Sequence, residues 1–240
     1  MKTITIKGDV VSDATGKLFD WFDLDSIYPQ KVKQAFDNLN GDDVEVIMTT
    51  NGGSVFSGQE IYDIIKNYSG KTTLKISGLV ASIGTLISCA FDEVYISPVA
   101  TFMIHNPTLG DVSGEKSDME KAAQLLETVE RTLISAYVSK TGLGESEVSQ
   151  MMAKETFMTA QETVDNGFAD GLIEESQSIS LVAGFDNLSN SAFIEKLQKL
   201  KDKEESDLAT AEAKARLRLF ELEEKKWQLT KLKNWLKQEM

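Results

Sequence analysis

The chain is organised around Gly78-Leu79-Val80-Ala81-Ser82-Ile83-Gly84, where a short strand pattern meets an apolar helical pattern. Small side chains surround Ser82, which suits a tight turn that a substrate backbone can approach closely. Further along, Met103-Ile104-His105-Asn106-Pro107 contains the one histidine of the sequence. Working outward from the two stretches gives both the fold class and a candidate site.

Ser82 and His105 together indicate nucleophilic chemistry. A serine hydroxyl is a weak nucleophile near neutral pH and needs an adjacent base, a role for which histidine is well suited. Taken alone, Ser82 is better explained as a helix N-cap, and a lone histidine is usually structural or exposed. A metal site is disfavoured, because one His and one Cys supply few soft ligands.

Apolar runs on both sides of Ser82 alternate between strand and helix patterns, which predicts an α/β fold with βαβ units and a largely parallel sheet. A first strand is expected near residues 4–11. Further strands are expected over 44–48, 73–76, 93–96, 101–104 and 156–159, and helices over 29–39, 57–68, 78–90, 117–140, 147–154 and 160–166. For the long helix, Ser117 is the expected N-cap, with Glu120 at the third position. Functional groups gather at the carboxyl ends of parallel strands, so Gly53, Ser82 and His105 are expected at one site.

Asn51-Gly52-Gly53-Ser54 follows the second of these strands. Gly53 and Gly58 have the spacing of a phosphate-binding loop, but Gln59-Glu60 replaces the Lys and Ser/Thr that such a loop requires. We therefore reject a nucleotide site. A glycine pair at a strand end can instead present a backbone N–H to a developing oxyanion, although a simple turn has the same spacing.

A third catalytic group would be an acid that orients the histidine. Glu155, Asp165 and Asp170 are all candidates, and their spacing does not choose between them.

Composition limits the function classes. The 240 residues carry a net charge of −13, which argues against nucleic acid or an anionic membrane surface as the main partner. A single cysteine excludes a disulfide framework and fits an intracellular protein, with Cys89 expected in the core. The N-terminus has no apolar core typical of a signal peptide, and the apolar run 78–91 is too short to span a membrane.

The last quarter of the chain has a different pattern. Residues 176–191 are rich in Ser and Asn and are expected to form a linker. Within residues 192–240, apolar residues recur every seven positions, which predicts a helix with an apolar seam. These positions are Leu208, Ala215, Leu222, Leu229 and Leu236. The expected organisation is therefore a domain over 1–175, a linker, and a helical segment of coiled-coil type that binds a partner or itself.

Four ordered stretches resemble the Clp protease proteolytic subunit (ClpP) family, and more narrowly its phage-encoded head-maturation (prohead) proteases. Asn51-Gly52-Gly53-Ser54-Val55 resembles the family's Asn-x-x-Gly-Gly stretch, and 78–84 resembles its Gly-x-Ala-Ala-Ser-Met-Gly motif. Residues 103–107 are similar to Met-Ile-His-Gln-Pro, and 155–160 to Asp-Arg-x-x-Ser/Thr-Ala. The resemblance covers roughly residues 4–174.

The resemblance implies a ClpP/crotonase-like fold with subunits in closed, usually sevenfold, rings that stack through the helix 117–140. It places Glu155 where the family has its catalytic aspartate, and it leaves Asp165 and Asp170 with structural roles. Because Glu is longer than Asp, the backbone at this position must lie slightly further from the histidine. The resemblance also assigns the oxyanion donors to the backbone N–H groups of Gly53 and Ile83, with no cofactor.

The leading hypothesis is a serine endopeptidase with Ser82, His105 and Glu155 as its triad, acting in phage head maturation. Its substrates would be polypeptides such as coat or scaffold proteins, and its place the host cytoplasm or the procapsid. Whether a Clp ATPase acts with it stays open. One alternative is a catalytically idle, ring-forming assembly protein, and a second is a crotonase-like acyl-CoA enzyme, for which the sequence has no CoA signal.

Overall fold

The computed structural model describes residues 1–110 and 112–173, so the expected linker 176–191 and helical segment 192–240 lie outside the described residues. The strands are β1 (Lys2–Lys7), β2 (Asp9–Val10), β3 (Ser26–Ile27), β4 (Val44–Thr50), β5 (Thr72–Ala81), β6 (Glu93–Ile96), β7 (Thr101–Ile104), β8 (Thr156–Thr159) and β9 (Gly171–Leu172). The helices are α1 (Asp13–Trp21), α2 (Pro29–Asp37), α3 (Val55–Lys66), α4 (Ile83–Ser88), α5 (Lys116–Thr141), α6 (Glu145–Ala153) and α7 (Ala160–Asp165).

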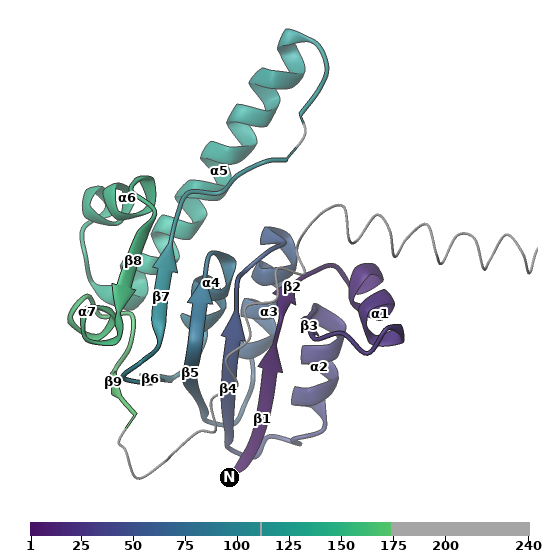
Figure 1. Ribbon diagram of the computed structural model, residues 1–240, viewed down its shortest axis with the longest axis vertical. Helices are drawn as coiled ribbons and strands as arrows, with labels where there is room; N and C mark the ends of the chain where they lie inside the picture. The colour runs from purple at the N-terminus through teal and green to yellow at the C-terminus, as the bar shows by residue number, and fades with distance from the viewer. Residues whose placement is uncertain (111, 174–240) are drawn as a thin grey trace, which may run out of the picture. The chain divides into compact units, whose positions relative to one another are not determined.

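Seven of the described strands form one sheet, in which β1, β4, β5, β6 and β9 lie side by side in that order. β7 pairs with the C-terminal end of β5 on one side and with β8 on the other (Figure 1). Within the described part of the chain, β7–β8 is the antiparallel pair of this sheet and its other pairs are parallel. The predicted α/β class with a largely parallel sheet is therefore confirmed.

β5 pairs with two different strands on the same side. Its first half pairs with β6 through Ile76, and its last residues, Leu79–Ala81, pair with β7. Gly78, with φ of 73°, lies between the two halves and lets the strand change partner. The prediction that the helix 78–90 begins at Gly78 is wrong, because the strand continues to Ala81 and α4 begins at Ile83.

The core lies between the sheet and the helices that follow its strands. β4 alternates buried and half-buried residues along its whole length, as expected for a strand covered more fully on one face. The cluster of buried side chains includes Val46, Met48, Ile61, Ile76 and Ile87. Within residues 1–110 and 112–173, no helix has the length and apolar character needed to cross a membrane.

α5 extends well beyond the sheet (Figure 1). The sequence predicts this helix over nearly the same residues, but its apolar face is buried only in its second half, at Val129, Leu133 and Tyr137. Its N-cap is also different from the expected Ser117 with Glu120, because the capping box pairs Glu115 with Asp118. The first turn of α5 lies away from the core, so burial of side chains does not determine where the helix begins. The local hydrogen bonds of the cap determine it instead.

The N-terminal region departs most from the sequence interpretation. The pattern predicts one strand across residues 4–11, but Gly8, with φ of 104°, divides it into β1 and β2. An alanine Cβ at Gly8 would lie 2.4 Å from the carbonyl oxygen of Asp25, so the chain bends where only glycine fits. α1 is absent from the sequence interpretation; the Ser12 side chain caps it by accepting from the Thr15 N–H.

Candidate active site

Neighbouring parallel strands bring Ser82 and His105 together. β5 and β7 pair in a register that sets Ala81 opposite Met103, and the Ser82 N–H donates to the Met103 carbonyl at 2.9 Å. Ser82 and His105 each come directly after the end of a strand. The expectation that strand ends gather these groups is met in the geometry, since parallel strands end at the same edge of a sheet.

The two side chains form a hydrogen bond. His105 Nε2 lies 2.7 Å from Ser82 Oγ, and both residues are half-buried. If the hydroxyl donates this bond, Nε2 accepts it and the neutral imidazole carries its proton on Nδ1. In that tautomer the imidazole can take the proton of Ser82 while the oxygen attacks a carbon atom.

Ser82 occupies a strained backbone conformation, with φ of 56° and ψ of −130°. These angles are rare for a residue with a side chain and cost on the order of 1–3 kcal/mol. The conformation turns the chain abruptly from β5 into α4, with Ser82 at the N-cap. Such a turn exposes a nucleophile at the end of a strand and leaves the first helical N–H groups beside it.

The glycine turn 51–54 lies against Ser82. A Cβ added to Gly52, whose φ is 93°, would lie 2.5 Å from Ser82 Cβ and 3.0 Å from Ser82 Oγ. Gly53, with φ of 140°, is bridged to Val10 by bonds that its neighbours make: Val10 N–H to the Gly52 carbonyl and Ser54 N–H to the Val10 carbonyl. The N–H of Gly53 therefore points away from β2.

Two backbone amides beside Ser82 have free donors. Within residues 1–110 and 112–173, the N–H of Gly53 and the N–H of Ile83 donate no hydrogen bond. A free N–H next to a nucleophile can stabilise a developing negative oxygen. The sequence points to both residues, but it does not show that Gly52, the neighbour of Gly53, is the glycine in contact with Ser82.

The three candidate acids occupy different environments. β7 and β8 pair up to Ile104 opposite Thr156, so His105 and Glu155 each lie one residue beyond the final pair. Glu155 is exposed, with φ of 51°, and within the described residues its carboxylate makes no hydrogen bond to His105. The structure therefore places Glu155 nearby in register without joining it to the imidazole.

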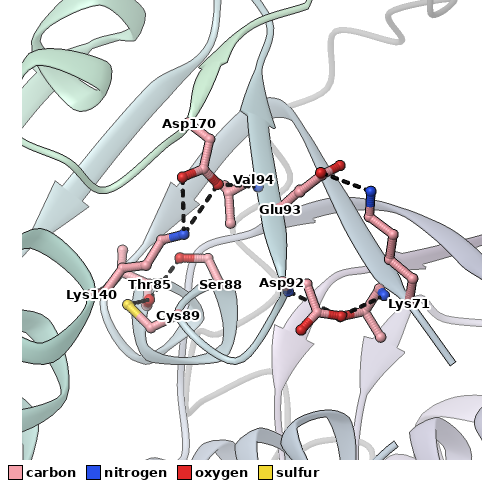
Figure 2. Close-up of polar contacts among 10 residues, drawn as sticks. Lys71, Thr85, Ser88, Cys89, Asp92, Glu93, Val94, Lys140 and Asp170 are labelled. Carbon is pink, nitrogen blue, oxygen red and sulfur yellow. Dashed lines mark hydrogen bonds and ion pairs between the residues drawn. The ribbon is translucent and has the colours of Figure 1, made fainter. Parts of the chain in front are cut away.

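The other two acids are used elsewhere. Asp170 accepts a hydrogen bond of 2.7 Å from the Val94 N–H and pairs with Lys140 at 3.1 Å, as Figure 2 shows. Asp165 accepts from the Gln161 side chain on the surface of α7. Both contacts fit the structural roles that the resemblance implied for these residues.

A buried acid that the sequence analysis does not single out supports the glycine turn. Asp9 is 8% exposed, and its Oδ1 accepts a hydrogen bond of 3.2 Å from Asn51 Nδ2. Burial raises the pKa of Asp9, and the bond from Asn51 offsets part of that rise. The Thr50 hydroxyl also accepts from the Gly52 N–H at 3.0 Å, so polar side chains hold the turn on both sides. The sequence signal that could have identified Asp9 is its position directly after Gly8, which has a positive φ.

A cysteine thiol is another kind of side chain that commonly serves as a nucleophile. Cys89 is buried in the core, and burial raises the pKa of its thiol to about 12. The thiol therefore stays protonated near neutral pH and is a poor nucleophile. Within residues 1–110 and 112–173, no group of three His, Cys, Asp or Glu side chains is arranged to hold a metal ion.

Comparison with known proteins identifies the class to which this fold and site belong. A family model described as Clp protease matches residues 33–176. The ATP-dependent Clp protease proteolytic subunit 1 of Protochlamydia amoebophila is 32% identical over 142 residues, which are 58% of this chain and 69% of that protein. The ATP-dependent Clp protease proteolytic subunit of Streptococcus agalactiae is 33% identical over 140 residues, 57% of this chain and 71% of that protein.

The chain therefore belongs to the Clp protease family. The matched residues 33–176 contain Ser82, His105, the glycine turn and Glu155. Membership of this family supports a peptidase, and it agrees with the fold class that the sequence predicted.

Proposed function

We propose that this chain is a serine endopeptidase in which Ser82 is the nucleophile and His105 the general base. The observation that carries the proposal is the 2.7 Å contact between Ser82 Oγ and His105 Nε2. That separation lies within the range for proton transfer between a nucleophile and its base. The strained turn at Ser82 and the free amides beside it support the same chemistry. Family membership supports the peptide bond as the substrate.

The reaction follows from these groups. Ser82 Oγ attacks the peptide carbonyl carbon while His105 Nε2 takes the hydroxyl proton, and the carbonyl oxygen becomes an oxyanion. The N–H groups of Gly53 and Ile83 donate to that oxygen. His105 then gives its proton to the leaving amine, and an acyl ester forms on Ser82. Water, deprotonated by His105, hydrolyses this ester and restores the serine.

Glu155 is the acid that we assign to the Nδ1 side of His105. Its support is the β7–β8 register, which sets Glu155 and His105 one residue past the same final pair. A carboxylate in this place would hold the tautomer that has its proton on Nδ1 and would stabilise the imidazolium. The exposed side chain must rotate toward the imidazole to make that bond.

We further propose that the subunits assemble into a homo-oligomeric ring and that residues 1–175 form the protease domain. Proteins of the Clp protease family form ring oligomers, which supports the assembly. Within the family, we place the chain in the phage head-maturation branch, cutting coat or scaffold polypeptides in the host cytoplasm or the procapsid. The support for that branch is the motif resemblance in the sequence.

The proposal is tested with the full chain and a fluorophosphonate probe, which reacts with activated serines. Wild-type protein should be labelled at Ser82 and should cleave an unstructured protein substrate, while Ser82→Ala should do neither. Ser146→Ala is the matched control, because Ser146 is exposed on α6 and its hydroxyl bonds the Gln150 side chain rather than a site residue. Cleavage that persists in purified Ser82→Ala would overturn the assignment of the nucleophile.

One observation favours a second candidate, the catalytically idle assembly protein. In the described part of the chain, no carboxylate bonds to His105, so the imidazole lacks the partner that a complete triad requires. An idle protein would assemble normally, as judged by native mass spectrometry, and Ser82 would resist the probe in the assembled state. Labelling of Ser82 in the assembly would exclude this candidate.

A further inference from the structure

Two consecutive side-chain hydrogen bonds link α5 to the backbone of Ser82. The Tyr137 hydroxyl of α5 lies 2.6 Å from Thr85 Oγ1 in α4, and Thr85 Oγ1 lies 2.5 Å from the Ser82 carbonyl oxygen. The Thr85 N–H reaches the same carbonyl at 3.0 Å. Tyr137 and Thr85 are 1% and 0% exposed, so the bond between their hydroxyls is buried, and the bond to the carbonyl of the half-buried Ser82 is partly buried.

The donors and acceptors in these two hydrogen bonds can be assigned in one way. Thr85 has a single hydroxyl proton, and it is donated to the Ser82 carbonyl. The Tyr137 hydroxyl must therefore donate to Thr85 Oγ1. Burial raises the pKa of Tyr137, so the phenol keeps the proton that it donates.

Contacts with neighbouring elements hold the C-terminal part of α5, from which the Tyr137 side chain extends. Lys140, one turn further along α5, pairs with Asp170, and Asp170 in turn accepts from the Val94 N–H of β6 (Figure 2). The Tyr137 ring also packs edge-to-face on Phe168, with centroids 5.6 Å apart. A threonine in a helix often bonds a carbonyl three residues back by itself. Here an anchored phenol from another helix fixes the direction of that bond.

The carbonyl of Ser82 and the N–H of Ile83 belong to one peptide group. In a trans peptide the two point in opposite directions, so holding the carbonyl sets the direction of the N–H. The positive φ of Ser82 is locally unfavourable, so neighbouring contacts must maintain this backbone conformation. Two of the bonds that do so come from Thr85.

We propose that Thr85 and Tyr137 are positioning residues that hold the Ser82–Ile83 peptide with the Ile83 N–H directed at the oxyanion. This inference rests on the proposed serine peptidase function and adds to it the residues that build half of the oxyanion hole. Neither residue touches the reacting atoms. Both act by holding the Ser82 carbonyl, which sets the direction of the Ile83 N–H in the same peptide group.

The test compares Thr85→Val, Thr85→Ser and Tyr137→Phe in the full chain. Loss of one oxyanion donor typically lowers kcat by about 100- to 1,000-fold, so partial misalignment in Thr85→Val should cost about 10- to 100-fold. Tyr137→Phe should cost less, about 3- to 10-fold, because Thr85 can still donate. In each variant KM should change by less than about twofold, since the donors act mainly in the transition state. Thr85→Ser keeps the hydroxyl and should restore most of kcat.

Tyr68→Phe is the matched control, because it removes a phenol hydroxyl that donates to the Asp42 carbonyl away from the site. Fluorophosphonate labelling of Ser82 should slow in parallel with kcat, while the assembly size stays that of the wild type. In the Thr85→Val background, adding Tyr137→Phe should change kcat no further, because the chain of bonds is already broken. Because Thr85 is fully buried, Tyr137→Phe carries the test if Thr85→Val does not fold.

The outcomes separate this inference from the proposed function. If wild-type protein cleaves through Ser82 but Tyr137→Phe matches Tyr68→Phe in kcat and labelling, the positioning role is wrong and the peptidase stands. If the two substitutions lower kcat additively, or only together with loss of assembly, their role is general packing and the inference is again overturned. If wild-type protein neither labels nor cleaves, both proposals fail.

Discussion

Gly52 and Ser82 pack so closely that a Cβ added to Gly52 would lie 2.5 Å from the Cβ of Ser82. This contact joins the glycine turn after β4 to the turn after β5, and no side chain larger than hydrogen fits between them. Gly52 also has φ of 93°, which disfavours any side chain on local grounds. Two independent reasons therefore require glycine beside Ser82.

We expect Gly52→Ala to lower kcat by about 100-fold or more, because the added methyl group displaces Ser82 Oγ and moves the Gly53 N–H, which we propose as an oxyanion donor. Because alanine is unfavourable at a positive φ, the substitution should also lower the free energy of unfolding by about 1–2 kcal/mol. Peptide cleavage and thermal unfolding measure the two effects. Gly144→Ala is the control, because a Cβ there meets nothing within 4 Å, and it should change stability by less than about 0.5 kcal/mol. Wild-type activity in Gly52→Ala would contradict the packing argument.

Ser82 and His105 should act as one unit. We expect Ser82→Ala and His105→Ala each to lower kcat by at least about 1,000-fold, and the double variant to be no worse than either single variant. The reason is that the base has no function without the hydroxyl proton that it removes. Single-turnover cleavage measured at matched assembly state tests this. Independent, multiplying losses would mean that the two residues do not share a step.

The local parts of the fold and site could be predicted from the sequence. β4, β6 and β7 are short apolar runs with turn residues beside them, and their positions follow from pattern alone. Ser82 and His105 could be paired because each follows such a run. The unpredicted parts depend on contacts between distant segments.

Three residues illustrate why such contacts escape the sequence. Gly78 has the residue type of a turn, but pairing with β6 and then β7 keeps it inside β5. Tyr137 has the periodicity of a core residue, and nothing local indicates that its hydroxyl meets Thr85. Asp9 is an acid in a two-residue strand, and only the folded chain brings it to Asn51. The ring size, the phage branch and the role of residues 192–240 stay predictions.

Glu155 should contribute through the imidazole. We expect Glu155→Gln to lower kcat by about 100- to 10,000-fold with little change in KM, because an amide does not stabilise the imidazolium. Glu147→Gln, on the exposed side of α6, is the charge-matched control. A Glu155→Gln protein with wild-type kcat would show that another group, or none, orients His105.

Asp170 gives a contrasting expectation. Its carboxylate accepts from the Val94 N–H and pairs with Lys140, both away from Ser82. We expect Asp170→Asn to lower the free energy of unfolding by about 1–3 kcal/mol, because a charge-assisted hydrogen bond is weakened. The kcat of the folded protein should stay within about threefold of wild type. A loss of kcat without a loss of stability would instead place Asp170 in the catalytic group.

Asp9 should make stability depend on pH. Burial raises the pKa of Asp9 above its ordinary value of 3.8, so the folded protein binds this proton more tightly than the unfolded chain. The stabilising effect is complete below the unfolded pKa and is lost as the pH rises through the folded pKa. Above that point, the buried charge lowers stability.

Asp9→Asn removes the charge and can still accept from Asn51, so the variant should gain Tm relative to wild type as the pH rises from about 3 to 7. Thermal unfolding followed by circular dichroism at several pH values measures this difference. Asp63→Asn, an exposed position on α3, corrects for the general change in net charge. Because Asn51 is the first residue of the glycine turn and, within the described residues, makes no hydrogen bond to Ser82, we also expect kcat of Asp9→Asn to fall by less than about tenfold, far less than for Gly52→Ala. A Tm difference that shrinks toward neutral pH would mean that the Asp9 carboxylate is stabilised where it lies, against the effect of its burial.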